Sequence, residues 1–185
     1  WTPRSRSGSP STRGNPVTRP THLAFASVLY LGGATLFGYP PDAIGWVLAA
    51  VASVLPDLDL PPSKIGRLFW FVSVPLERRF GHRTLTHSVL GIAALALLVL
   101  PLWWVGPLYF WAVVGGYWSH LWIDMVNVRG VDLFWPSAVR VVTPGHRHWR
   151  LQVGSKAEML LLAVLLALTV ALYPLIHLGF RDGLQ

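Results

Sequence analysis

The chain reads Gly81-His82-Arg83-Thr84-Leu85-Thr86-His87-Ser88 immediately before a long apolar run. This stretch gathers two histidines, an arginine and three hydroxyl side chains at the start of a hydrophobic segment. Polar groups beside apolar surroundings are costly unless something satisfies them, and metal binding is the use that paired histidines favour. Two histidines are too few to hold an ion, so further ligands must come from elsewhere in the chain.

The composition predicts a membrane protein. Of the 185 residues, 53% are hydrophobic and 12% are charged, whereas soluble domains carry about 25% charged residues. The length favours a single membrane-embedded domain over residues 21–185. Residues 1–20, rich in Arg, Ser and Pro, are expected to be a disordered basic arm or an artefact. Because the chain has no cysteine, a metal site must use His, carboxylates or other oxygens, which suits zinc first and then manganese or a similar divalent ion.

Five apolar segments predict an all-α, polytopic membrane bundle of about five transmembrane helices, since a span takes about 20 apolar residues. The segments are His22–Gly38, Ala43–Leu55, Ser88–Val105, Leu108–Asn127 and Ala157–Leu178. The second segment is short, and its assignment as a span is the weakest. The stretch Leu68–Leu76 is apolar but too short to cross, so an interfacial or re-entrant piece is expected there.

The basic residues fall on one side of this predicted bundle. With five spans, every Lys and Arg except Arg181 lies in the N-terminal arm, the 56–87 loop or the 128–156 loop. The positive-inside rule makes that side cytoplasmic. The expected location is therefore the inner membrane, with the protein multi-pass. The net charge of +7 then follows from topology and does not require a nucleic-acid partner.

The candidate metal ligands also lie at the cytoplasmic ends of the predicted spans. Each small motif has a structural alternative: the Asp57-Leu58-Asp59 pair could be a solvated loop or a helix cap, and the i,i+4 pair His120 and Asp124 could be a buried hydrogen bond. Convergence of four helix ends favours a site, because intramembrane ionisable groups are functional candidates. The predicted ligands are His22, Asp57, Asp59, His82, His87, His120 and Asp124.

Other residues receive supporting roles. Arg83 is predicted to hold an anionic group such as a phosphate, and Asp57 or Asp59 could act instead as general base. Thr86 is a candidate N-cap of the following helix. Thr86 or Ser88 would orient His87 from the outer shell, and Glu158 could be a further outer-shell group.

These motifs resemble a known family, the YdjM-like (LexA-regulated) inner-membrane metal-dependent hydrolases. The resemblance covers roughly residues 20–160. The family is in turn distantly similar to zinc-dependent phospholipases C. The resemblance implies hydrolysis by divalent metals at the cytoplasmic membrane face. The matching stretches are Thr21-His22, Leu55–Asp59, His82–Ser88, His120–Asp124 and Gly130–Pro136.

The predicted function is hydrolysis of a phosphoester, such as a small molecule or a phospholipid headgroup, because the site opens at headgroup level. One alternative is a metal-binding or metal-transporting membrane protein without hydrolysis; the apolar far halves of the spans argue against transport. A second alternative is a nucleic-acid-directed phosphodiesterase, which the basic loops suggest but do not require. The sequence leaves the oligomeric state open.

Overall fold

A computed structural model describes residues 19–81, 83–137, 139–146, 148 and 150–176 of the chain. The predicted N-terminal arm and His82 therefore lie outside the described residues, apart from Arg19 and Pro20, which already belong to the first helix. The described part is all-helical, with two isolated β-bridges in the loop after α7. Its elements are α1 (Arg19–Leu36), α2 (Ala43–Ala52), the 3₁₀-helix η1 (Leu55–Asp59), α3 (Lys64–Leu68), α4 (Trp70–Phe80), α5 (Val89–Leu98), α6 (Leu102–Val105), α7 (Pro107–Val126) and α8 (Lys156–Leu172).

The prediction of a polytopic bundle of about five transmembrane helices is wrong. Within the described ranges, no helix is both long enough and apolar enough to cross a membrane. The predicted third span shows the physical reason, because Pro101 has no N–H to continue a helix and the run divides into α5 and α6. The predicted second span ends at Ala52, after ten residues, a length of about 15 Å. The Leu68–Leu76 stretch forms the end of α3 and the start of α4, with Trp70 and Phe71 exposed.

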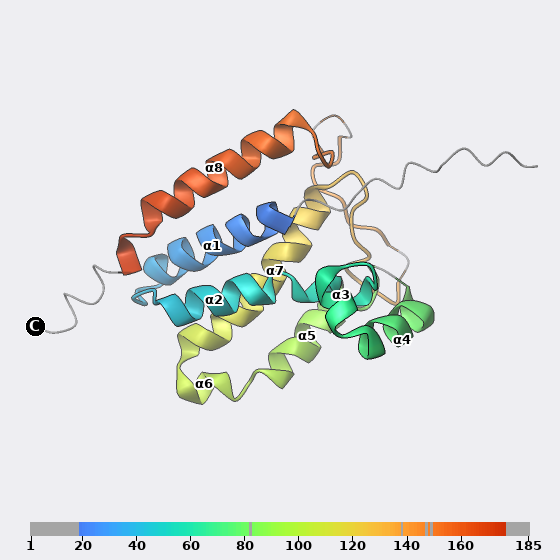
Figure 1. The fold of residues 1–185 in the computed structure, drawn as a ribbon, viewed down its shortest axis with the longest axis horizontal. Coiled ribbons are helices and arrows are strands. Elements are labelled where there is room, and N and C mark those ends of the chain that lie inside the picture. Colours follow the sequence, from blue (N-terminus) through green and yellow to red (C-terminus); the bar gives the residue numbers. More distant parts are fainter. Residues whose placement is uncertain (1–18, 82, 138, 147, 149, 177–185) are drawn as a thin grey trace, which may run out of the picture.

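Helix α7 is the element on which the others assemble. It packs against α1, α2, α5 and α6, and α1 lies between α2 and α8 (Figure 1). The approach of α2 to α7 depends on Gly116, because a Cβ there would stand 2.3 Å from the carbonyl oxygen of Ala49. This close packing fixes η1, which follows α2, beside the C-terminal half of α7.

Two buried clusters form the core. The first joins α1, α2 and α7 through Tyr30, Leu31, Ala49 and Ala112. The second joins α7 to the loop that follows it, through Tyr117, Leu121, Met125, Val131 and Leu133. The second cluster holds the 127–151 loop against the C-terminal end of α7, where the candidate site lies.

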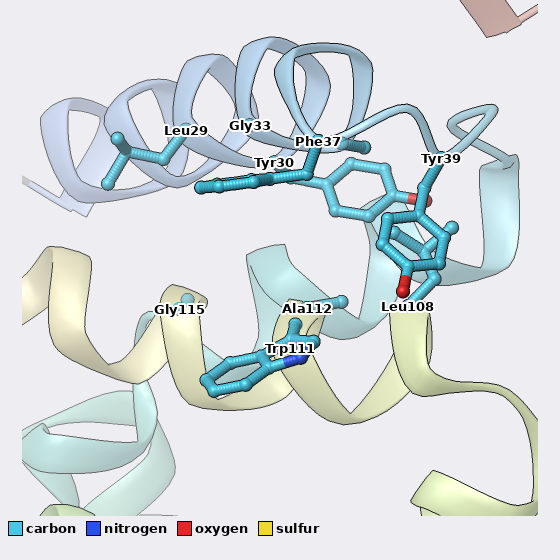
Figure 2. A pocket seen from close by; sticks show the side chains of 11 residues that line it. Leu29, Tyr30, Gly33, Phe37, Tyr39, Leu108, Trp111, Ala112 and Gly115 are labelled. Carbon is cyan, nitrogen blue, oxygen red and sulfur yellow. The ribbon is translucent and has the colours of Figure 1, made fainter.

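An apolar cavity of about 590 Å³ remains between the N-terminal half of α7 and the C-terminal half of α1 (Figure 2). Phe37, Tyr39 and Trp111 are among the side chains that line it. No Cβ placed on Gly33 or Gly115 would meet another atom within 4 Å, so these two glycines leave the cavity open.

Candidate metal centre

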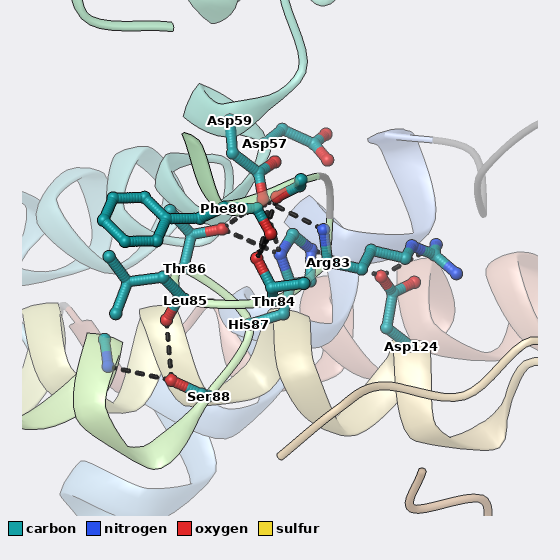
Figure 3. Close-up of polar contacts among 12 residues, drawn as sticks. Asp57, Asp59, Phe80, Arg83, Thr84, Leu85, Thr86, His87, Ser88 and Asp124 are labelled. Carbon is teal, nitrogen blue, oxygen red and sulfur yellow. Dashed lines mark hydrogen bonds and ion pairs between the residues drawn. The ribbon is translucent and has the colours of Figure 1, made fainter. Parts of the chain in front are cut away.

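Four elements bring buried histidines and carboxylates together at one end of the fold. His22 lies in the first turns of α1, Asp57 in η1, His87 just before α5, and His120 and Asp124 in the last turns of α7. All five residues are less than 10% exposed. Figure 3 shows the 81–88 loop folded between η1 and α7, so that Asp57 and Asp59 lie on one side of His87 and Asp124 on the other.

Asp124 occupies the middle of this cluster. Its Oδ1 is 3.9 Å from His22 Nε2, and its Oδ2 is 3.5 Å from His87 Nε2. The same Oδ2 is 3.7 Å from His120 Nε2, which lies 3.8 Å from Asp57 Oδ1. Ligand atoms about 2.1 Å from a tetrahedral zinc ion are about 3.4 Å apart. The separations in the cluster therefore suit shared coordination better than hydrogen bonding.

Among the residues that the structure describes, two overlapping sets of three ligand atoms meet this spacing. In each set, all atoms lie within 4.8 Å of one another; the sets are His22, His120 and Asp124, and Asp57, His87 and His120. His120 belongs to both, but its ring can coordinate through one nitrogen only, as its hydrogen bonding shows. The residues that would hold a divalent ion are therefore His22, His120 and Asp124, or Asp57, His87 and His120.

The ring of His120 is held in a defined tautomer. Its Nδ1 lies 2.7 Å from the carbonyl oxygen of Ser53. A carbonyl only accepts hydrogen bonds, so Nδ1 carries the proton and Nε2 presents its lone pair to Asp57 and Asp124. The ring also stacks on His22, with centroids 4.0 Å apart and planes 12° from parallel. A backbone carbonyl on the outer nitrogen is the usual way in which a metal-binding histidine is oriented.

Unpartnered ring nitrogens occur in the cluster. His22 Nδ1 and His120 Nε2 are both buried and have no hydrogen-bond partner among the described residues. A buried polar atom left without a partner costs about 1–3 kcal/mol, and a metal ion would satisfy such nitrogens. Burial lowers the pKa of both histidines, that of His22 strongly. They are therefore neutral at physiological pH, the form that binds metals.

Arg83 enters the cluster as a counter-charge. Its Nη2 lies 2.8 Å from Asp124 Oδ2, and its backbone adopts a left-handed conformation with φ 64°. Burial raises the pKa of Asp124, but the charge of Arg83 and the nearby histidines lower it more, so the pKa ends below its ordinary value. Arg83 Nε and Nη1 are buried and have no hydrogen-bond partner in the described part of the chain.

Asp59, also a predicted ligand, makes different contacts from Asp57. Its Oδ2 accepts hydrogen bonds from the backbone N–H of Arg83, at 3.0 Å, and from the Thr86 hydroxyl. Because Thr86 gives its only proton to Asp59, it must accept from His87 Nδ1, 3.0 Å away. His87 Nε2 is then the lone-pair nitrogen that faces Asp124. Asp59 belongs to neither ligand set and orients His87 through Thr86; its role as a ligand remains a prediction.

The residues predicted to support the ligands make three different kinds of contact. Thr86 contacts His87 as expected, but it does not cap the next helix. Ser88 is the N-cap of α5 and accepts a hydrogen bond from the backbone N–H of Gly91, so it supports the helix. Glu158 is buried and accepts from Thr21, the neighbour of His22, and from the backbone of Gly154.

Two supporting residues escaped the sequence analysis. Tyr117 is buried one turn before His120, and its hydroxyl donates to the Thr86 carbonyl oxygen. The i,i+3,i+7 spacing of Tyr117, His120 and Asp124 on one helical face was a signal for it. The backbone carbonyl of Ser53 accepts a hydrogen bond from His120. A backbone contact of this kind cannot be predicted from a pattern of residue types.

The fold and the site define an all-helical protein with a buried histidine–aspartate cluster able to hold a divalent metal. The chain matches the family described as YdjM inner membrane protein over residues 17–180, and it belongs to that family. The resemblance predicted from the motifs is therefore confirmed. No solved structure matches the chain, and the expected similarity to zinc-dependent phospholipases C remains a prediction.

Two relatives illustrate the family. The inner membrane protein YdjM of Escherichia coli K12 is 35% identical over 137 residues, which are 69% of this chain and 70% of the relative. The uncharacterized protein YvsG of Bacillus subtilis 168 is 32% identical over 168 residues, 87% of this chain and 98% of the relative.

Proposed function

We propose that this protein is a membrane-associated, metal-dependent hydrolase of phosphoesters. The observation that carries the proposal is the buried Nε2 of His120, which has no hydrogen-bond partner among the described residues and lies 3.7 Å from Asp124 Oδ2. His22, His120 and Asp124 together form a set with the spacing of metal ligands. Buried polar atoms are normally satisfied. Four separate elements contribute to this cluster of imidazole nitrogens and carboxylate oxygens. A bound cation is the partner that such ligand atoms suit.

The donor set favours zinc. Three imidazoles and two carboxylates match the nitrogen and oxygen ligands of zinc sites, whereas magnesium prefers oxygen alone. His22, His87, His120, Asp57 and Asp124 would hold the ion or ions. A bound divalent ion would supply Lewis acidity and lower the pKa of a water toward about 7.

The protein's own groups would bind and orient the substrate. Arg83 has two buried donors, Nε and Nη1, that have no hydrogen-bond partner among the described residues, and a guanidinium N–H can donate to a phosphate oxygen. Asp57 is the more exposed of the two η1 carboxylates, at 7%, and is the better placed to accept a proton from water. Asp59 would keep His87 in its coordinating tautomer through Thr86.

The inner membrane is the proposed location, because the Escherichia coli relative is named an inner membrane protein. The α3 and α4 helices and the 127–155 loop lie at the same end of the fold as the site (Figure 1). That end carries exposed Arg67, Arg78, Arg79 and Arg129. Basic segments are attracted to the anionic lipids of the cytoplasmic leaflet, which supports a site that faces the cytoplasm.

Elemental analysis of the purified protein tests the metal site. We expect stoichiometric zinc in the wild type and its loss in Asp124→Asn and His120→Ala. Asp132→Asn and His146→Ala, which change the same residue types outside the cluster, should keep the metal. A wild type without stoichiometric metal, or cluster variants that retain it fully, would show that the proposed site is wrong.

Hydrolysis is tested separately, with zinc-loaded protein and either bis(p-nitrophenyl) phosphate or a phospholipid. Turnover should depend on zinc and disappear in Asp124→Asn. Metal binding without hydrolysis of either substrate would favour the non-catalytic alternative. Salt-sensitive binding of DNA by the purified protein would favour the nucleic-acid-directed alternative.

A further inference from the structure

Four consecutive apolar side chains are exposed where α3 meets α4. Leu68, Phe69, Trp70 and Phe71 are 71%, 40%, 66% and 60% exposed. The ring of Phe71 contacts those of Phe69 and Trp70 edge to face, with centroids 6.2 Å and 6.4 Å apart. Single exposed apolar residues are common on proteins, whereas a contiguous exposed group marks an interaction surface.

Basic side chains lie on both sides of this aromatic group. Lys64 and Arg67 precede it in α3, Arg78 and Arg79 follow it in α4, and all four are exposed. Glu77 is the acidic residue of the two helices, so four basic residues and one acidic residue give them a net charge of +3. A partner with a negatively charged surface over an apolar layer complements both the charges and the aromatic rings.

Helix α4 also indicates how deeply such a partner would receive it. Phe71, Pro75 and Arg78 follow a spacing of four and three residues, which places them on one face, and all three are exposed. Pro75 has no N–H, so the carbonyl of Phe71 lacks its helical donor. Such a carbonyl is costly in hydrocarbon, whereas water satisfies it among lipid headgroups. Aromatic rings are also enriched at headgroup level.

We infer that this surface binds an anionic phospholipid bilayer at the level of its headgroups. The inference rests on the proposed function, which places the protein at a membrane, and it names the part of the chain that contacts the lipid. The aromatic rings enter the interface, and the guanidinium groups lie at the lipid phosphates. The α3–α4 surface consists of Leu68, Phe69, Trp70, Phe71, Arg78 and Arg79.

Contacts with η1 connect the α3–α4 surface to the metal centre. The buried hydroxyl of Ser63 accepts from the N–H of Gly66, at the start of α3, and donates to the carbonyl oxygen of Asp57. Gly66 has no room for a side chain, because a Cβ there would collide with the carbonyl oxygen of Leu60. Helix α4 packs against η1 as well. A bilayer bound at this surface therefore lies near the segment that carries Asp57.

The absence of cysteine from the chain allows a test with a single labelled position. Phe71→Cys carries an environment-sensitive fluorophore, and Ile44→Cys is the control. Phe71 and Ile44 are similarly exposed, at 60% and 63%, but Ile44 lies in α2, which has no basic residue. The labelled full chain is reconstituted into vesicles of equal parts phosphatidylcholine and phosphatidylglycerol. A nitroxide quencher is attached to the headgroup of either lipid, or deep in an acyl chain.

The headgroup nitroxides should quench the fluorophore on Phe71→Cys more than the acyl-chain nitroxide does. Phosphatidylglycerol should quench it about fivefold more than phosphatidylcholine, the enrichment that one basic residue at the surface gives. The two lipids should quench Ile44→Cys equally. The double change Arg78→Gln and Arg79→Gln should lower the ratio at Phe71→Cys toward one, as should about 1 M salt, which shortens the screening length to about 3 Å.

The outcomes separate this inference from the proposed hydrolysis. Zinc content and bis(p-nitrophenyl) phosphate turnover are measured on the same samples. A preference for phosphatidylglycerol that depends on Arg78 and Arg79 supports the surface even if no substrate is hydrolysed, in which case the hydrolysis alone fails. No quenching of Phe71→Cys, equal lipid preference at both positions, or stronger quenching from the acyl-chain nitroxide overturns the surface. A disulfide between two Phe71→Cys chains in place of lipid contact also overturns it and assigns the surface to a second copy of the chain.

Discussion

The guanidinium of Arg83 lies 2.8 Å from the carboxylate of Asp124, and both side chains are buried. The Asp124 carboxylate also lies within 4 Å of a ring nitrogen of each of His22, His87 and His120. In the absence of a metal ion, Arg83 supplies the positive charge that this carboxylate needs. A divalent ion held by Asp124 would supply the same counter-charge, so Arg83 and the metal partly replace each other.

Arg83→Gln should lower the free energy of unfolding in EDTA by about 3 kcal/mol, because a buried carboxylate then loses its partner. Added zinc should restore more stability to this variant than to the wild type. Thermal unfolding with EDTA and with zinc measures both effects. Arg140→Gln, which breaks an exposed pair with Asp132, should change stability by less than about 1 kcal/mol. If zinc stabilised Arg83→Gln and the wild type equally, Arg83 and the metal would not be alternative counter-charges for Asp124.

Thr86→Val should weaken zinc binding by about 10–100-fold, the usual effect of losing a group that orients a metal ligand. The hydroxyl of Thr86 connects Asp59 to His87 Nδ1, and valine keeps its shape without this connection. Zinc titration against a competing chelator gives the affinity. Thr84→Val is the control in the same loop, because the Thr84 hydroxyl donates to the Phe80 and Gly81 carbonyl oxygens. Similar zinc affinities for the two variants would exclude the orienting role.

Ser88→Ala should lower the free energy of unfolding by about 1 kcal/mol, because α5 loses its N-cap, and should leave zinc affinity as in the wild type. Ser88→Asn keeps a capping oxygen and should recover part of the stability. Urea unfolding and the chelator titration provide the two measurements. If Ser88→Ala weakened zinc binding as much as Thr86→Val, Ser88 would act on the metal centre after all.

Gly116→Ala should destabilise the protein by about 1–3 kcal/mol, as overpacking does, because its Cβ would collide with the carbonyl oxygen of Ala49. Gly115→Ala, one residue earlier, meets nothing within 4 Å and should stabilise the helix by about 0.5–1 kcal/mol. Urea unfolding of the two variants compares them directly. A neutral Gly116→Ala would mean that α2 and α7 can separate without cost.

The sequence by itself determined the helical class and the family, and it named the histidines and aspartates of the centre. The length of the apolar segments predicted the helices, because a membrane span takes about 20 apolar residues. Segment length overestimated the continuity of the helices: Pro101 divides the predicted third span, and the predicted second span becomes α2 followed by η1. The prediction of a five-span bundle was therefore wrong, because apolar content alone does not show where a helix ends.

Only the tertiary structure decided what each polar residue does. Asp57 and Asp59 are alike in sequence, yet Asp57 faces His120 while Asp59 accepts hydrogen bonds from Arg83 and Thr86. Arg83, predicted to meet a substrate, lies against Asp124. The tautomer of His120 depends on the carbonyl oxygen of Ser53. Such roles follow from distances of a few ångströms between residues far apart in the chain, and spacing along the sequence does not encode them.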